Sequence, residues 1–280
     1  MHAFAKRARY ATLRGMSIVL LSWLAAVLYV SAALVLALPL LSRAQPPRLL
    51  GLALAWPAVL LHIVVVLGNF LHEGGLDLHF FAALSLMAVG VAGLCVVVNL
   101  MRPVAALGVI VFPLAALLLL TALTAPHMPL PIEWQIKLHV IFALLGYSVL
   151  CFAALLAIGL ALQERALRRR QFSGLLRILP PLTLTEALMF QLIRAGFVLL
   201  SLTLLSGILF VHNLFDQHLV HKTVLSIAAW LVFGILLWGR WRYGWRGRRA
   251  VQLTLWGMAL LLLAFFGSQF VLEVVLKRVA

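Results

Sequence analysis

The sequence has few acidic residues and few charged residues of any kind. Asp and Glu number 7 in 280 residues, against 22 Lys and Arg, and charged residues make up 10% of the chain. Soluble domains carry about 25% charged residues. Hydrophobic residues reach 65% and the mean hydropathy is +1.14, and a soluble fold of this length cannot hide so much apolar surface. The composition therefore excludes an ordinary soluble domain and predicts an integral membrane protein.

Motifs and residue types that support several kinds of chemistry are also missing. No Asp or Glu falls in the middle of an apolar run, where ion- and proton-coupled carriers place carboxylates, and this argues against a proton-driven antiporter. The sequence has no Walker lysine loop, no GxSxG and no HExxH, so we expect no enzymatic activity. The two cysteines, Cys95 and Cys151, lie inside apolar runs and form no CxxC pair. Thiol redox chemistry and a structural zinc site are therefore not expected.

Eight apolar runs are long enough to cross a bilayer as helices of about 20 residues. We expect spans near residues 16–40, 51–71, 78–100, 104–125, 135–162, 190–211, 222–239 and 250–273. The predicted fold is an all-α polytopic integral membrane helix bundle, with a basic leader over 1–15 and a single transmembrane domain over 16–275. The longest break, over 163–189, contains the proline pair at 180–181. After this pair, Thr183 with Glu186 is typical of a capping box that opens the next helix.

Basic residues are distributed unevenly between the breaks. Those after the first, third, fifth and seventh runs hold nearly all the Lys and Arg of the internal loops, whereas the other breaks hold only Lys137 and Lys222. Cytoplasmic loops carry the excess of Lys and Arg, so we expect a multi-pass protein of a bacterial inner (plasma) membrane with both termini in the periplasm. The leader, with Lys6 and Arg7, opposes this orientation, and Met16 directly before the first run offers an alternative start. This pattern accounts for the net charge of +15 without nucleic-acid binding.

Histidines gather on the expected outer side. Most of the nine lie at or near the outer ends of the runs, whereas His62 lies deep in the second run. An ionisable group inside a membrane needs a compensating partner. Two interpretations are open for His62, namely a neutral imidazole bonded to a neighbouring helix and a metal or haem ligand. His139 opens the fifth run and His221 the seventh, so two imidazoles at matched depth are placed to bind one iron from both sides.

Several separated blocks follow one another in a familiar order. The sequence WQIKLHV at 134–140 precedes GY at 146–147, and a longer block covers 202–249. Together they resemble the cytochrome c assembly family of haem-handling membrane proteins (the CcsA/CcmC group), and more closely its YpjD-like (HemX-related) branch. The tryptophan-rich segment of haem-delivering members is missing, because HNLFDQHLVH at 212–221 stands in its place. The run WGRWRYGW at 238–245 lies at the cytoplasmic end of its span and is typical of an aromatic belt with an arginine anchor.

The resemblance implies heme as the cofactor. It implies contact between haem and His139, with His62 as an intramembrane ligand, so that these two residues are the candidates for binding the haem iron. His212 and His221 follow from the block that borders the missing segment. A haem also needs cations for its carboxylates, and Lys222 is one of the two outer loop lysines close in sequence to a candidate ligand.

These observations leave three functional hypotheses. The first is a haem-binding inner-membrane protein of cytochrome c assembly type that handles or senses haem at the outer face, with the lipid bilayer, haem and another membrane protein as partners. The second is a non-enzymatic membrane partner subunit of a metal-ion transport system, in which the histidines are structural. The third, a small-solute permease, lacks the coupling carboxylates and interrupted helices of such carriers.

Overall fold

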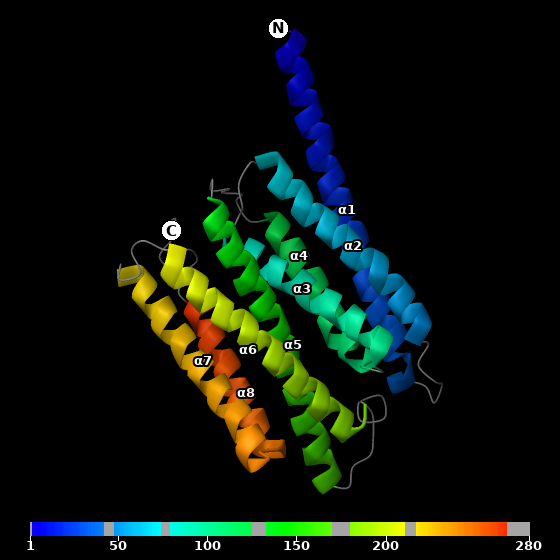
Figure 1. The fold of residues 1–280 in the computed structure, drawn as a ribbon. Coiled ribbons are helices and arrows are strands. Elements are labelled where there is room, and N and C mark those ends of the chain that lie inside the picture. Colours follow the sequence, from blue (N-terminus) through cyan, green and yellow to red (C-terminus); the bar gives the residue numbers. More distant parts are fainter. Residues whose placement is uncertain are drawn as a thin grey trace. The chain divides into compact units, whose positions relative to one another are not determined.

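The chain folds into helices. The computed structural model describes residues 2–41, 48–73, 79–102, 104–124, 133–169, 180–210 and 217–267, and none of these ranges contains a strand. The helices are α1 (His2–Leu41), α2 (Arg48–Glu73), α3 (Phe80–Met101), η1 (Ala105–Leu107), α4 (Gly108–Thr124), α5 (Trp134–Arg168), α6 (Leu182–Phe210), α7 (Gln217–Tyr243), α8 (Gly247–Leu262) and the π-helical turn η3 (Leu263–Gly267) (Figure 1). Eight segments are long and apolar enough to cross a membrane. The predicted all-α polytopic membrane bundle is therefore confirmed.

The start of α6 differs from the sequence-based expectation. The carbonyl of Pro181 accepts hydrogen bonds from the backbone N–H groups of Leu184 and Thr185, both at 3.0 Å. The first turn therefore begins before Thr183, and the predicted capping box is wrong. Proline at a helix start costs no hydrogen bond, because the first N–H groups have no partner within the helix. Glu186 binds arginines instead, as described below.

By its internal contacts, the chain divides into two compact units. Unit 1 covers Met1–Asn99 and Gly108–Pro131. Within it, α1 packs against α2 and α4, and Ala25, Val65 and Leu119 from these three helices form a buried apolar cluster. Buried small residues let membrane helices approach closely, which is how helices associate where lipid is as apolar as their side chains.

Unit 2 covers Leu100–Leu107 and Ile132–Ala280, and contains η1, α5 to α8 and η3. In it α5 packs along α6, and a Cβ atom on Gly146 of α5 would lie 3.5 Å from Leu199 of α6. The backbones therefore approach closely along this pair. On the other side α7 packs against α8, where a Cβ atom on Gly257 would come within 2.7 Å of the Phe233 ring. The missing side chain at Gly257 is what admits the buried phenylalanine.

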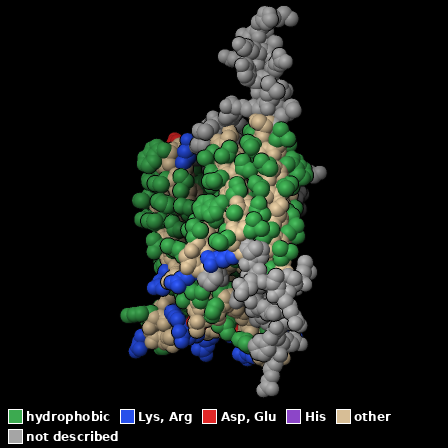
Figure 2. All heavy atoms as spheres, turned by 90° about the vertical axis from the view of Figure 1, so that its right-hand side faces the viewer, with side chains coloured by type: hydrophobic (Ala, Val, Ile, Leu, Met, Phe, Trp, Pro, Cys, Tyr) green, Lys and Arg blue, Asp and Glu red, His purple; other side chains and the backbone are tan. Residues whose placement is uncertain are grey.

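The surface is apolar over most of its described extent. Hydrophobic side chains cover most of the face shown in Figure 2, and Lys and Arg side chains gather mainly toward one end. Residues such as Leu20, Leu34 and Ile208 are more than half exposed. An apolar surface of this extent is expected of a bundle that is solvated by lipid.

Candidate ligand-binding cavity

Unit 2 contains a cavity of about 480 Å³ between α5, α6, α7 and η3. Small-molecule and cofactor sites have volumes of about 300–1,000 Å³ and combine apolar walls with a few polar groups. The walls here are mostly apolar, and the side chains with polar atoms are His139, Tyr147, Ser201, Thr203, Lys222, Thr223, Ser226 and Trp230. Leu205, Ile208 and Ile227 line the cavity and are themselves exposed, so it reaches the apolar surface of unit 2 between α6 and α7.

His139, in the second turn of α5, is the only imidazole among the described residues that line this cavity. Its Nδ1 lies 3.0 Å from Oγ of Ser206 on α6. The Ser206 hydroxyl donates its single hydrogen to the carbonyl of Thr203 at 3.0 Å. Its oxygen must therefore accept a hydrogen bond from His139, which places the proton of the neutral ring on Nδ1. Nε2 then carries the lone pair.

A glycine makes room for this imidazole. A Cβ atom on Gly207 would lie 3.3 Å from Cε1 of His139, which is closer than an ordinary van der Waals contact. The edge of the ring that carries Cε1 and Nδ1 therefore lies against Gly207. Ser206 and Gly207 together determine where the ring sits and which of its nitrogens carries the proton.

Hydrogen bonds also fix two aromatic side chains in the other walls of the cavity. Trp230 on α7 donates from Nε1 to Oγ of Ser201 at 2.8 Å, and its ring stacks on Phe197 with centroids 5.4 Å apart. Tyr147 on α5 donates to the carbonyl of Leu261 on α8 at 2.7 Å. Buried aromatic rings whose polar atoms are satisfied hold a fixed orientation, so these walls are preorganised.

Lys222 supplies a positive charge at the cavity. It lies in the second turn of α7, and its Nζ is 5.5 Å from the centroid of the Phe265 ring in η3. A cation over an aromatic face is stabilised by the ring quadrupole. The cavity therefore offers one imidazole and one ammonium group within otherwise apolar surroundings, a combination suited to a largely apolar ligand with an acidic group.

The expected pairing of His139 with His221 does not occur in this arrangement. The side chain of His221 is exposed and is not part of the cavity wall, whereas its neighbour Lys222 is. Consecutive helical residues point about 100° apart, so only Lys222 of the two lines the cavity. His212, the other candidate from this region, lies outside the described residues.

His62 lies in unit 1, where it is fully buried. Its Nε2 is 2.9 Å from Oγ of Ser85 on α3, and its Nδ1 is 3.4 Å from the hydroxyl of Tyr29 on α1. The Tyr29 ring also stacks on Phe112 of α4. Both ring nitrogens of His62 therefore have partners on neighbouring helices. This is the geometry of a bonded neutral imidazole, the first of the two interpretations above.

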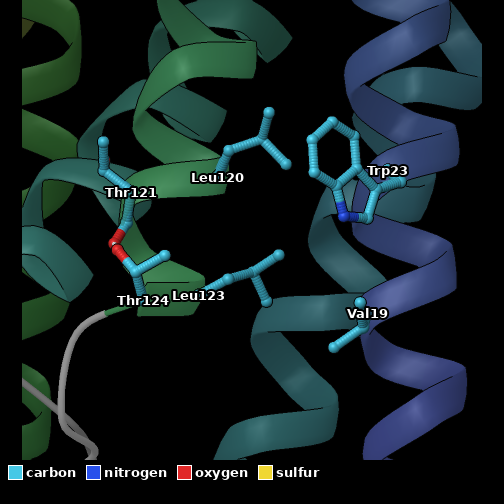
Figure 3. A pocket seen from close by; sticks show the side chains of 6 residues that line it. All are labelled: Val19, Trp23, Leu120, Thr121, Leu123 and Thr124. Carbon is cyan, nitrogen blue, oxygen red and sulfur yellow. The ribbon is translucent and has the colours of Figure 1, made fainter.

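A second cavity, of about 460 Å³, lies in unit 1 between α1 and α4. Figure 3 shows the Trp23 ring facing Leu120 and the hydroxyls of Thr121 and Thr124 close together. These hydroxyls donate to the backbone carbonyls of Leu118 and Thr121. The wall contains no titratable side chain, so this cavity offers little beyond apolar contact. Over the described part of the chain, no three His, Cys, Asp or Glu side chains are grouped so as to hold a metal ion.

Sequence reasoning missed the residues that orient His139. Thr203 and Ser206 are three positions apart in the sixth span, so they share one helix face. A polar face on an otherwise apolar span is a signal that points to a partner on another helix. The sequence alone does not say that this partner is His139, 67 residues away.

Comparison with known proteins agrees with this architecture. A sequence model of the family described as cytochrome C assembly protein matches residues 59–276. The "Inner membrane protein YpjD" of Escherichia coli strain K12 is 41% identical over 137 residues, which is 49% of this chain and 52% of the relative. An "uncharacterized 28.8 kDa protein in nifR3-like 5'region" of Azospirillum brasilense is 37% identical over 143 residues, 50% of this chain and 53% of the relative.

The chain thus spans about half the length of the curated relatives that it matches. No solved structure matches it. The family match covers the part of α2 that carries His62 and the whole region from α5 to η3 that forms the cavity. On this basis the chain belongs to the cytochrome C assembly protein family.

Proposed function

We propose that this protein binds haem in the cavity between α5, α6, α7 and η3, and that Nε2 of His139 is the iron ligand. The observation that carries this proposal is the hydrogen bond between His139 and Ser206. Ligating histidines typically donate their second ring N–H to a neighbouring acceptor, which fixes the tautomer and the ring orientation. His139 is arranged in this way before any ligand binds.

The residues around the cavity fit such a group. Haem would supply an iron that takes an imidazole as a ligand, and two carboxylates that need cations. His139 offers a neutral imidazole with its lone pair on Nε2, and Lys222 offers the ammonium group. The apolar side chains of α6 and α7 that line the cavity would exclude water from the remaining surface of the haem. The hydrogen bonds of Trp230 and Tyr147 fix two of the cavity walls.

In this proposal His62 has a different task. Its two hydrogen bonds join α1, α2 and α3 within unit 1, and neither ring nitrogen is available to a ligand unless a bond is broken. His62 is then a structural residue, and His221, exposed at the start of α7, is not an iron ligand.

The protein handles or senses haem and does not itself catalyse a reaction. Family membership supports the link to haem, and the tryptophan-rich segment of haem-delivering members is replaced here. The E. coli relative is named as an inner membrane protein, and we place this protein in a bacterial inner membrane too. The arginine-rich ends of α5, α7 and α8 then face the cytoplasm, which puts the start of α5, with His139, toward the outer face.

The test is a hemin titration of the detergent-purified protein, followed by its Soret absorption. The wild type should give a shifted Soret band that saturates at one hemin per chain. His139→Ala should abolish the shift or weaken binding at least tenfold, whereas His62→Ala and the matched control His221→Ala should keep it. A wild type without a saturable shift, or a shift that survives in His139→Ala, would refute the proposal.

A second function is also compatible with a structural His62. The buried, doubly bonded histidine is expected equally of a non-enzymatic partner subunit in a metal-ion transport system. In that case no saturable hemin binding is found. A second membrane protein instead co-purifies in stoichiometric amount, and substitution of His139 leaves that complex intact.

A further inference from the structure

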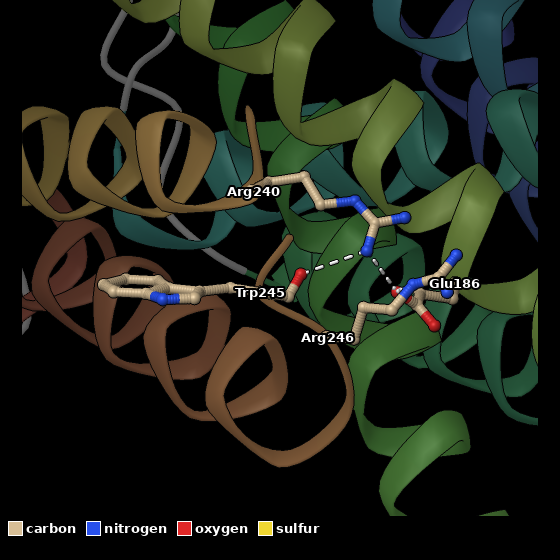
Figure 4. Close-up of polar contacts among 4 residues, drawn as sticks. All are labelled: Glu186, Arg240, Trp245 and Arg246. Atoms are coloured by element: carbon tan, nitrogen blue, oxygen red, sulfur yellow. Dashed lines mark hydrogen bonds and ion pairs between the residues drawn. The ribbon is translucent and has the colours of Figure 1, made fainter. Parts of the chain in front are cut away.

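The turn between α7 and α8 is held by ionic contacts rather than left as an open loop. Nη1 of Arg240 lies 2.9 Å from Oε1 of Glu186 and 3.1 Å from the carbonyl of Trp245, and Nε of Arg246 is 3.4 Å from the same carboxylate oxygen (Figure 4). The guanidinium of Arg240 also lies over the Phe190 ring, 4.6 Å from its centroid. One carboxylate from α6 therefore binds both sides of the turn.

Glycines complete this turn. Gly244 and Gly247 have φ angles of +64° and +54°, in the left-handed region where a glycine carries no steric cost. The N–H of Gly244 donates to the Arg240 carbonyl at 3.2 Å, which ends α7. The Trp245 ring lies directly on Gly239, where a Cβ atom would collide with it. The turn is therefore a preorganised surface.

Positive charge remains on this surface after the internal pairs are made. Arg242, Arg248 and Arg249 are exposed, and none of them has an acidic partner in the described part of the chain. Arg246 shares Glu186 with Arg240, and its side chain is 70% exposed. The described carboxylates beside the turn are Glu186 and Glu164, whose Oε1 lies 2.9 Å from the position of a Cβ atom on Gly247. Two carboxylates cannot neutralise the five arginines between residues 240 and 249, so the turn presents an excess of guanidinium groups to its surroundings.

Aromatic side chains show where these arginines sit relative to lipid. Trp238, Trp241 and Tyr243, in the last turns of α7, are 58%, 83% and 68% exposed. Exposed Trp and Tyr at the ends of membrane spans mark the headgroup level of the bilayer. The arginines that accompany and follow them are therefore at the depth of lipid phosphates.

We propose that the exposed arginines and tryptophans of the α7–α8 turn form a binding site for an anionic phospholipid headgroup. Guanidinium groups bind phosphate oxygens through paired N–H donors, and clusters of basic residues beside membrane helices recognise anionic lipids. A zwitterionic headgroup carries its own ammonium group, which these arginines repel. The site thus selects phosphatidylglycerol over phosphatidylcholine. This inference is independent of haem binding.

The experiment is a lipid titration of the full-length purified protein, followed by native mass spectrometry. The wild type should retain phosphatidylglycerol in preference to phosphatidylcholine. The triple variant Arg242→Gln, Arg248→Gln, Arg249→Gln should weaken phosphatidylglycerol binding by about a hundredfold, at about fivefold for each arginine near the surface. Arg240, Arg246 and Glu186 are left in place so that the turn itself is preserved.

A control variant removes the same number of positive charges, three, from another surface of unit 2. Arg165, Arg168 and Arg169 are exposed at the end of α5, where no Trp or Tyr accompanies them. Their joint replacement by Gln should therefore weaken phosphatidylglycerol binding clearly less than the first triple variant does. Equal loss in both triple variants, or a wild type that does not distinguish the two lipids, would overturn the proposal. If the first triple variant is not monodisperse, Arg248→Gln and Arg249→Gln are measured singly, and an unchanged affinity in both refutes it.

Discussion

Gly207 lies against the imidazole of His139, so close that a Cβ atom at this position would be 3.3 Å from Cε1. Ser206, which precedes Gly207 in α6, is hydrogen-bonded to Nδ1 of the same ring. Two consecutive residues of one helix therefore fix both the position and the tautomer of a histidine on another helix. The proposed iron ligand depends on α6 as much as on α5.

Replacing Gly207 with Ala should shift the His139 ring by a few tenths of an ångström and weaken hemin binding several-fold. Ligand geometry is sensitive to displacements of this size, because a coordinating site must be held within about 0.5 Å. The measurement is the hemin titration described above. Gly68→Ala is the matched control, since in the described part of the chain no other side chain and no other helix lies within 4 Å of the added methyl group, and it should leave hemin binding unchanged.

Removing the Ser206 hydroxyl should reduce hemin affinity by about 10–100-fold, the usual effect of losing a partner that orients a ligand. Without the Ser206 oxygen the ring keeps only the backbone of Thr203 as a hydrogen-bond partner on α6, so its orientation is held less firmly. Ser201→Ala serves as the control on the same helix, because Ser201 bonds Trp230 and not His139. Equal effects of the two substitutions would show that Ser206 has no special relation to the ligand.

Lys222→Gln should lower the affinity for hemin but not for hemin dimethyl ester, which has no free carboxylate. Loss of one charge-assisted pair costs about 1.5–3 kcal/mol, or about 10–100-fold in affinity. Lys137→Gln provides the matched change near the start of α5, outside the cavity wall. If Lys222→Gln weakens both ligands alike, the lysine shapes the cavity and does not recognise the carboxylate.

His62→Ala should destabilise unit 1 while hemin binding is retained. The substitution leaves the hydroxyls of Tyr29 and Ser85 without their buried partner, and each unsatisfied group costs about 1–3 kcal/mol. Thermal unfolding in detergent should therefore occur at a lower temperature than in the wild type. Unchanged stability would mean that water or another side chain replaces the imidazole at no cost.

The orientation in the membrane can be tested with cysteines at the two ends of α5. With Cys95 and Cys151 replaced by Ala, Glu133→Cys should react with an impermeant maleimide from the periplasmic side, and Arg169→Cys only from the cytoplasmic side. Both positions are exposed at the ends of the helix. Reversed labelling would place the arginine-rich ends outside, contrary to the usual distribution of Lys and Arg.

The sequence determined the features that depend on neighbouring residues. Hydropathy over about 20 residues identified the eight spans, because a helix satisfies its own backbone hydrogen bonds and needs only apolar side chains to lie in lipid. The ordered blocks after residue 134 identified the family. One local pattern gave a wrong prediction, because Thr183 and Glu186 have the spacing of a capping box. In the structure the Pro181 carbonyl accepts the first helical hydrogen bonds, and Glu186 binds Arg240, 54 residues away.

Only the tertiary structure decided what each histidine does. His62 meets Tyr29 and Ser85, which are 33 and 23 residues away, and His139 meets Ser206, 67 residues away. The physical reason is that a long apolar run is enough for a membrane helix to form. It does not determine how that helix is rotated or which helices pack against it, because lipid tolerates any apolar face. Close packing at small residues and hydrogen bonds between helices select one arrangement. That arrangement turned His62 into the protein interior, His221 outward, and His139 toward a cavity.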